Sequence, residues 1–438
     1  MQGAPATGDR QRARAPLAPR AAAARRYANT LAGAYSPRAN QPKRSPPMSP
    51  RQPRMDDERE QLLGALEREA GEALALARWM SAHPELSLEE RATSDRYVAH
   101  LGARGFAIER GVAGLETAFV ARRGSGPLRV ALLAEMDALP EIGHACGHNL
   151  SGPASLLAAS ALAAVLPTEA LSLVVVGCPA EELGIGKRRL VAAGVFDGVH
   201  AALMAHASDM RRAHRLFLGI RKFELVFHGR AAHAAAYPER GVNALDGVIA
   251  LFVAIGLLRQ QLPREARIHG IVSDGGQAPN VIPERAAARI WVRALDDAVL
   301  DDAAARLLRC AEGAATATGT RLEVIPDESA SPSLRPNLAL AAVYRRQLER
   351  LGLPESAHAP DESIGSSDIT HVSRVVPTIH PNFPIGSRLA LHTREFAAAA
   401  ASPAGEAGLL EGARALALSI LTLVREPETR AAVAAEGP

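Results

Sequence analysis

The chain has 438 residues, 47% of them hydrophobic and 22% charged, which is enough to build two domains with buried cores. No stretch reaches the roughly 18 uninterrupted apolar residues that a membrane span needs, so we expect no membrane partner. Residues 1–54 contain ten Arg and Lys43 but one acidic residue, Asp9, so their net charge is +10. The net charge of the whole chain is +3, which leaves residues 55–438 with −7. An acidic body argues against a nucleic-acid partner.

The segment 1–54 is rich in Ala, Arg, Pro and Ser and lacks apolar periodicity, so we predict a disordered basic extension. A transit peptide shares this composition, whereas a secretory signal would need an apolar core that is not present here. Alternatively, translation begins at Met48 or Met55 and the extension is not part of the protein.

Residues 55–212 predict alternating helices and strands. Apolar residues at helical spacing indicate helices at about 56–81 and 89–103. Two continuous apolar runs, Leu128–Ala134 and Leu171–Cys178, indicate buried strands, with an Ala- and Leu-rich helix between them at about 151–166. This alternation is typical of a mostly parallel α/β sheet, whose sites gather at the carboxyl ends of its strands.

The pattern changes over residues 213–328 and then returns to the α/β type. Strands are predicted at Leu216–Phe227, Arg267–Val272, Ala286–Arg293 and Arg321–Pro326, and helices at Asn243–Leu262 and Asp297–Thr316. This β-α-β-β-α-β order is the split ferredoxin-like unit. A helix at Asn337–Leu351, a strand at Thr378–Phe383 and a helix at Ala404–Val424 follow. We therefore predict a catalytic domain formed by 55–212 and 329–438, with 213–328 inserted as a lid or dimerisation domain.

The densest polar cluster, Glu135–Asn149, follows the first buried strand. Cys146 and His148 are two residues apart in a Gly-containing loop, so a thiolate and an imidazole can bind one divalent ion, while Asp137 is placed to orient a ligand or tune the attacking water. The alternative is a buried Cys beside a surface His.

The spacing of the three cysteines, Cys146, Cys178 and Cys310, is not that of a disulfide framework. This favours a reducing compartment, and we expect a cytoplasmic protein.

A pair of glutamates, Glu181 and Glu182, follows the second buried strand. Adjacent side chains point in different directions, so one can bind metal while the other acts as a general base for metal-assisted hydrolysis. His206 and His392 each follow a short apolar stretch. Each of these residues alone is compatible with an ordinary core or surface position. Together with Cys146 and His148 they form a five-ligand set, which suits two ions better than one structural zinc.

The inserted domain offers three further polar residues, His233, Asn280 and Arg293. They are plausible donors to a substrate carboxylate and to an oxyanion, although turn positions explain them equally well.

These motifs resemble the zinc aminoacylase/carboxypeptidase family, metallopeptidase family twenty, over residues 60–425. The branch of β-alanyl-lysine dipeptidase-like proteins and p-aminobenzoyl-glutamate hydrolase subunits is the most similar. The stretches that carry this match are Asp137–Pro140, Gly143–Asn149, Gly365–Asp368 and His380–Gly386.

The resemblance implies the ligands and the assembly. It implies Cys146, His148, Glu182, His206 and His392 as ligands of two divalent ions, Zn²⁺ or Mn²⁺, with Glu181 as the base that activates the attacking water. It also implies a homodimer formed through the inserted domain, with His233 reaching the neighbouring active site. In this interpretation Asn280 and Arg293 hold the carboxylate of a dipeptide or N-acyl amino acid.

Two positions depart from the family pattern. Glu135 stands where relatives carry Asp or His, which leaves the number of ions open, and Asn149 replaces an Asp, which weighs against simple N-acetyl substrates. The alternative functions are a catalytically inactive binding or scaffold homologue and a ureido-group hydrolase.

Overall fold

The structure is a computed structural model that describes residues 53–357 and 364–438. The predicted extension lies outside these residues apart from its last two, where helix α2 (Pro53–Ala82) begins.

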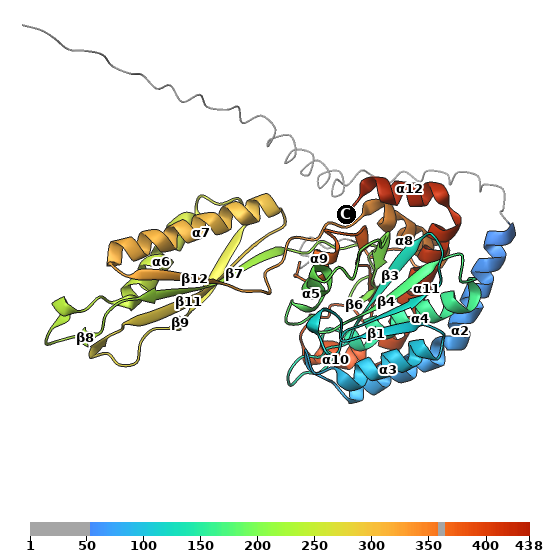
Figure 1. The fold of residues 1–438 in the computed structure, drawn as a ribbon, viewed down its shortest axis with the longest axis horizontal. Coiled ribbons are helices and arrows are strands. Elements are labelled where there is room, and N and C mark those ends of the chain that lie inside the picture. Colours follow the sequence, from blue (N-terminus) through green and yellow to red (C-terminus); the bar gives the residue numbers. More distant parts are fainter. Residues whose placement is uncertain (1–52, 358–363) are drawn as a thin grey trace, which may run out of the picture. The chain divides into compact units, whose positions relative to one another are not determined.

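The catalytic domain is built on a six-stranded sheet in the order β1-β2-β4-β3-β5-β13 (Figure 1). Three neighbouring pairs, β4 with β3, β3 with β5 and β5 with β13, are parallel, while β1 and β2 form an antiparallel edge. The prediction of a mostly parallel sheet is therefore confirmed. The strands are β1 (Ala107–Arg110), β2 (Phe119–Arg123), β3 (Arg129–Glu135), β4 (Ser172–Cys178), β5 (Ala201–Leu203) and β13 (Thr378–Ile379).

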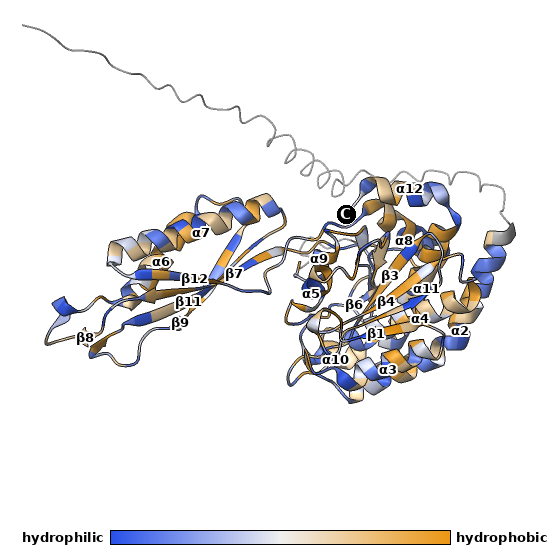
Figure 2. Ribbon diagram, viewed as in Figure 1, coloured by the Kyte–Doolittle hydropathy of each residue, from blue (hydrophilic) through white to orange (hydrophobic). Residues whose placement is uncertain are grey.

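Helices cover both faces of this sheet. Val130 and Leu132 of β3 belong to the core shared with α2, α4 and α11, whereas Ala131 and Leu133 belong to the core shared with α5 and α9. A strand buried on both faces needs apolar residues at every position, which explains the continuous apolar run of β3. The outer helix α3 instead mixes hydrophilic and hydrophobic residues (Figure 2). The helices are α2, α3 (Arg91–Gly102), α4 (His148–Val165), α5 (Gly186–Ala192), α8 (Leu338–Arg350), α9 (Ile369–Val372), α10 (Arg394–Ala400), α11 (Pro403–Arg425) and α12 (Pro427–Glu436).

Helix α11 is long and apolar enough to cross a membrane, and among the described residues it alone passes this test. However, 78% of its apolar window is buried inside the protein, where the helix packs against α4 and α2. Its composition is therefore that of a core helix.

The inserted domain has the predicted β-α-β-β-α-β order. Its sheet runs β12-β7-β11-β9 with every neighbouring pair antiparallel, and α6 and α7 share its buried core. Asn243 and Asp296 cap the two helices through their side-chain oxygens, which satisfies otherwise unpaired N–H groups at each start. The elements are β7 (Gly219–His228), α6 (Ala244–Arg259), β9 (Arg267–Asp274), β11 (Arg285–Ala294), α7 (Asp297–Thr318) and β12 (Arg321–Pro326).

Two details differ from the sequence-based expectations. The single strand predicted at Thr378–Phe383 is divided into β13 and β14 (Asn382–Pro384), and β14 pairs with β6 (His206–Ser208) in a separate two-stranded sheet. Pro381 lies at the division, where it has no N–H to donate to a continuous ladder. In the inserted domain, β8 (Ala232–His233) pairs with β10 (Val281–Ile282). Two-residue strands are too short to show an alternating pattern.

Candidate metal centre

Most of the predicted ligands follow the carboxyl ends of β3, β4 and β5, as expected for a parallel sheet. The last residue of β3 is Glu135, and the Glu181–Glu182 pair follows the end of β4. His206 opens β6, shortly after β5 ends. The chain therefore brings these side chains to one edge of the sheet.

The side chains converge in two overlapping groups. The potential ligand atoms of Cys146, His148 and His206 lie within 4.8 Å of one another, and so do those of Cys146, His148, Glu181 and Glu182. Cys146 Sγ lies 3.7 Å from His206 Nε2. The structure thus places four of the five predicted ligands, together with the predicted base, at one centre.

The fifth predicted ligand, His392, lies at the open side of this centre. Its Nε2 is 3.4 Å from Glu182 Oε2, and its side chain is 53% exposed. The backbone N–H of His392 donates to the Ala145 carbonyl at 2.9 Å, which ties its loop to the loop of Cys146. His392 has a φ of 61°, a conformation that costs energy for a non-glycine residue and is often found at functional sites.

A left-handed glycine shapes the loop that carries Cys146 and His148. Gly147 has a φ of 84° and directly precedes helix α4, so the chain turns sharply between the two candidate ligands. A Cβ at this position would lie 2.6 Å from the Ala207 Cβ. Only glycine fits both the conformation and the space.

Hydrogen bonds orient both buried imidazoles. His148 Nδ1 lies 2.8 Å from the Asp137 carbonyl and 3.1 Å from Asp137 Oδ1, and His206 Nδ1 lies 2.8 Å from the Ala207 carbonyl. These acceptors call for a proton on Nδ1, so a neutral ring presents the lone pair of Nε2 to the centre. Burial lowers the pKa of His206 to about 4, which keeps that ring neutral.

Asp137 is itself held by three donors. Besides His148, its Oδ2 accepts from Ser87 Oγ at 2.7 Å and from the backbone N–H of Glu182 at 3.0 Å. The predicted orienting residue therefore connects the β3 loop, the β4 loop and the imidazole of His148.

A divalent cation fits this donor set. Within the described residues, His148 Nε2, Glu135 Oε2 and Glu182 Oε1 are buried and have no hydrogen-bond partner. Unpartnered buried polar atoms are costly, and a cation would satisfy all three. Burial opposes a charge on His148, but Glu135, Cys146 and Asp137 raise its pKa well above the ordinary value in the metal-free protein, so the groups that face this ring are mainly acidic. One thiolate, imidazoles and carboxylates are the ligands that Zn²⁺ prefers.

Glu181 has an environment suited to a general base. Burial and the neighbouring carboxylates Glu135 and Glu182 raise its pKa well above the ordinary value. The preceding residue, Ala180, has a φ of 55°, and its N–H donates to Glu90 Oε1 at 2.9 Å. A strained backbone fixed by a buried carboxylate therefore sets the position of Glu181.

Sequence reasoning missed a buried ion cluster behind the centre. Lys187 Nζ lies 2.7 Å from Glu135 Oε1 and 2.5 Å from Asp368 Oδ1, and all three side chains are fully buried. Glu135 and Asp368 stand in the motifs noted above, but no spacing in the sequence links either residue to Lys187.

The predicted catalytic residue His233 and the predicted substrate-binding residues Asn280 and Arg293 are divided between the two ends of the inserted domain. His233 and Asn280 lie together, because β8 pairs with β10 and the Ala234 N–H donates to the Asn280 carbonyl at 3.0 Å. His233 Nδ1 accepts from the N–H groups of Ala235 and Ala236, as a turn residue would. Arg293 lies near the other end of β11 and donates to Ser366 Oγ at 3.2 Å. In the described part of the chain, no hydrogen bond or ion pair joins His233 or Asn280 to the candidate ligands.

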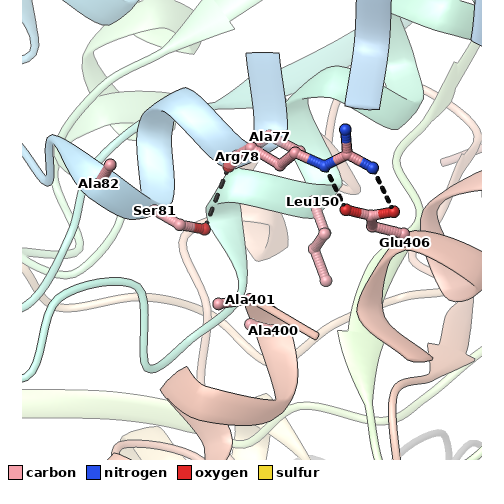
Figure 3. A pocket seen from close by; sticks show the side chains of 8 residues that line it. All are labelled: Ala77, Arg78, Ser81, Ala82, Leu150, Ala400, Ala401 and Glu406. Atoms are coloured by element: carbon pink, nitrogen blue, oxygen red, sulfur yellow. Dashed lines mark hydrogen bonds and ion pairs between the residues drawn. The ribbon is translucent and has the colours of Figure 1, made fainter. Parts of the chain in front are cut away.

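A cavity of about 310 Å³ lies between α2, α4, α10 and α11 and contains none of the candidate ligands. Arg78 closes it with two bonds to Glu406 at 2.6 and 2.8 Å, and the other labelled lining residues are small or apolar (Figure 3). Ser81 in its wall accepts from Asn149 Nδ2 at 2.8 Å. Asn149, next to His148, thus anchors α4 to α2.

Comparisons with known proteins show which proteins the chain resembles. A family model described as the peptidase dimerisation domain matches residues 218–317. The chain is 36% identical over 378 residues to an Xaa-Arg dipeptidase of Mus musculus, covering 82% of this chain and 87% of that relative. It is 35% identical over 295 residues to a p-aminobenzoyl-glutamate hydrolase subunit of Escherichia coli K12, covering 62% and 61%. A solved Bacillus subtilis structure, described as a dinuclear metal-binding peptidase of the M20 family, aligns with a TM-score of 0.62 and 21% identity, covering 81% and 99%.

These matches, on this fold, define a metal-dependent hydrolase that acts on carbon–nitrogen bonds. The extent of the match to the dipeptidase shows that the chain belongs to the M20 metallopeptidase family. The resemblance stated from the sequence motifs is therefore confirmed.

Proposed function

We propose that the chain hydrolyses the amide bond of dipeptides or N-acyl amino acids, with Glu181 as the base that activates water. The convergence of Cys146, His148, Glu181, Glu182 and His206 is the observation that carries this proposal. The names of the two curated relatives, a dipeptidase and an aminobenzoyl-glutamate hydrolase, support substrates of this type.

The proposed cofactor is a pair of divalent ions, Zn²⁺ or Mn²⁺, held by Cys146, His148, Glu182, His206 and His392. Bound ions would polarise the scissile carbonyl and make the attacking water more acidic. The concentration of acids supports two ions rather than one. Besides the Cys146 thiol, five carboxylates lie in the centre and the adjoining ion cluster, and Lys187 forms ion pairs with two of them, Glu135 and Asp368; the five are Glu135, Asp137, Glu181, Glu182 and Asp368. The Cys146 thiolate favours Zn²⁺, a borderline-soft ion.

Glu181 moves the proton in this mechanism. Its carboxylate takes a proton from the attacking water and gives it to the nitrogen of the leaving amine, which breaks the C–N bond. Burial beside Glu135 and Glu182 raises the pKa of Glu181 in the metal-free protein, an environment that strengthens this carboxylate as a proton acceptor. Asp137 orients His148 throughout.

A homodimer through the inserted domain is the proposed assembly. Ile249, Val253 and Leu257 are spaced at four-residue intervals on α6 and are 54%, 60% and 73% exposed. The neighbouring β9 lies at the edge of the sheet and exposes Ile271. An exposed apolar helix face and an open strand edge in one small domain call for a partner, and a second copy of the chain could cover them.

The placement of the polar residues in the inserted domain supports completion of each active site by the partner. From Arg285, which pairs with His228, to Arg293, β11 extends over eight residues, roughly 26 Å at the usual rise. His233 and Asn280 therefore lie about the length of the sheet from Arg293. We propose that Arg293 holds the substrate carboxylate within its own chain, while His233 and Asn280 contact the substrate held by the partner, where His233 donates to the developing oxyanion.

A substrate panel tests the function. Dipeptides, N-acyl amino acids and ureido compounds are offered to the protein loaded in turn with Zn²⁺, Mn²⁺ and Co²⁺, and product amine is measured. Turnover of dipeptides or N-acyl amino acids that is lost with a chelator and restored by metal is the expected result. Turnover of ureido compounds alone would favour a ureido-group hydrolase, and metal binding without turnover of any compound would favour an inactive binding homologue.

The proposed location is the cytoplasm. The free thiols of all three cysteines support it, because a reducing compartment keeps thiols unpaired.

A further inference from the structure

We propose that Glu135 is an additional ligand of the metal centre, held in position by the buried pair Lys187 and Asp368. This inference rests on the proposed metal-dependent function and assigns a residue that lies outside the five-ligand set. It concerns Glu135 Oε2, which among the four carboxylate oxygens of Glu135 and Asp368 is the one without a hydrogen-bond partner in the described residues.

The first step is the position of the two Glu135 oxygens. Oε1 accepts from Lys187 Nζ at 2.7 Å, whereas Oε2 has no hydrogen-bond partner among the described residues. Oε2 lies 3.4 Å from His148 Nε2 and 3.8 Å from His206 Nε2. Lys187 therefore fixes one oxygen of Glu135. The other oxygen faces Nε2 of His148 and Nε2 of His206, which the Nδ1 hydrogen bonds of the two rings turn toward the centre.

The second step is the spacing of three pairs of donor atoms: Glu135 Oε2 with each of the two ring nitrogens, and Cys146 Sγ with His206 Nε2. Atoms bound to one ion at about 2.0–2.3 Å and tetrahedral angles lie roughly 3.3–3.8 Å apart. The observed separations of 3.4, 3.8 and 3.7 Å, the last between Cys146 Sγ and His206 Nε2, fall in this range. A direct charged hydrogen bond between Glu135 and His148 would be about 2.7–2.9 Å long, which is clearly shorter. The spacing fits a shared cation better than an ion pair.

The third step is charge. Lys187 carries one positive charge, and the fully buried Glu135 and Asp368 carry two negative charges. Asp368 is fully engaged, because its Oδ1 contacts Lys187 Nζ and its Oδ2 accepts from the Lys187 backbone N–H at 2.8 Å. The excess negative charge therefore remains on Glu135 Oε2. An unsatisfied buried carboxylate oxygen is unfavourable without a cation and favourable with one.

The test compares metal binding and stability of the Glu135→Gln variant with those of the wild type, independently of activity. Metal per chain is measured by mass spectrometry, affinity by competition with a chromophoric chelator, and the ligand field by visible absorption of the Co²⁺-loaded protein. We expect affinity at one site to fall by about 100-fold or more and the Co²⁺ spectrum to change. The Tm of the metal-free variant should equal or exceed that of the metal-free wild type, because Lys187 and Asp368 remain as a balanced pair.

Glu411→Gln is the matched control. Glu411 is also buried, but both its oxygens accept from the Arg211 guanidinium, so its loss should leave metal affinity and the Co²⁺ spectrum unchanged. The double variant Lys187→Met/Asp368→Asn removes two opposite charges and keeps Glu135. Without its anchor, Glu135 should bind metal about 10- to 100-fold more weakly.

Each outcome is decisive. Wild-type affinity and spectrum in Glu135→Gln, or a lower metal-free Tm with unchanged affinity, would show that Glu135 is only structural and would overturn the inference. Unchanged affinity in the double variant would overturn the role of the anchor, a result that holds even if Glu135→Gln does not fold. A wild-type protein that binds no divalent ion would instead overturn the proposed function itself.

Discussion

Glu181 and Glu182 are adjacent in the sequence but have different neighbours in the fold. Glu182 Oε2 lies 3.4 Å from His392, whereas Glu181 Oε2 lies 3.8 Å from His148 and has a strongly raised pKa. We predict that Glu181→Gln lowers kcat by about three orders of magnitude or more while metal content stays at the wild-type level, because the amide cannot take up the proton. Steady-state kinetics and metal analysis of the same sample check this. A variant that keeps more than a few per cent of the activity would exclude Glu181 as the base.

Two buried cysteines allow a matched test of the thiolate. Cys146 lies in the ligand cluster, whereas Cys178 at the end of β4 donates to the Val176 carbonyl at 3.3 Å and belongs to the core. We expect Cys146→Ala to abolish activity and to lower bound metal, while Cys178→Ala keeps both. Metal content and turnover of the two variants are the measurements, and full metal binding by Cys146→Ala would contradict the assignment.

At the residue scale, the sequence predicts groups that stand next to one another and misses those that meet through the fold. Cys146 and His148 are visible because a short loop carries both. Lys187 meets Glu135 and Asp368 across separations of 52 and 181 residues, and a single lysine in the first turn of helix α5 carries no sign of these partners.

At the scale of elements, the turn between β3 and α4 depends on one glycine. We predict that Gly147→Ala destabilises the protein by at least about 1–2 kcal/mol, the usual cost of a left-handed conformation, and also weakens metal binding, because the new Cβ would press on Ala207. Gly319→Ala at the end of α7 is the control, since its φ of 69° carries the same backbone cost but nothing lies within 4 Å. Denaturant unfolding and chelator competition measure both effects, and equal metal affinity in the two variants would contradict the prediction.

Elements with long periodic patterns could be predicted, and very short ones could not. β4 and α11 depart from their predicted ends by at most one residue, because continuous burial demands apolar side chains throughout. The pairs β8–β10 and β6–β14 consist of two- and three-residue strands, so hydrogen bonding across the fold, rather than a local pattern, defines them. These short elements carry His233 and His206, which is why their surroundings could not be derived from the sequence.

At the scale of the whole molecule, mixed dimers test whether the partner completes each site. Glu181→Gln and His233→Ala homodimers should each be nearly inactive. After subunit exchange about half of the dimers are mixed, and each mixed dimer has one site with both groups intact if His233 acts on the partner. Activity should then recover to roughly a quarter of the wild-type value, by the counting that twofold symmetry imposes. Exchange is followed with differently tagged chains, and no recovery despite complete exchange would show that His233 acts within its own chain.

The length of β11 also has a consequence for how the protein behaves on dilution. Because β11 separates Arg293 from His233 and Asn280, an isolated chain would keep its metal centre and Arg293, yet would lack the His233 and Asn280 contacts that the partner supplies. In the proposed arrangement each active site needs a second chain, and the fraction of sites that have one depends on the protein concentration. Specific activity should therefore fall as the protein is diluted below the Kd of the dimer, while metal per chain stays constant. Activity per chain that does not vary across the dissociation measured by sedimentation would show that each chain works alone.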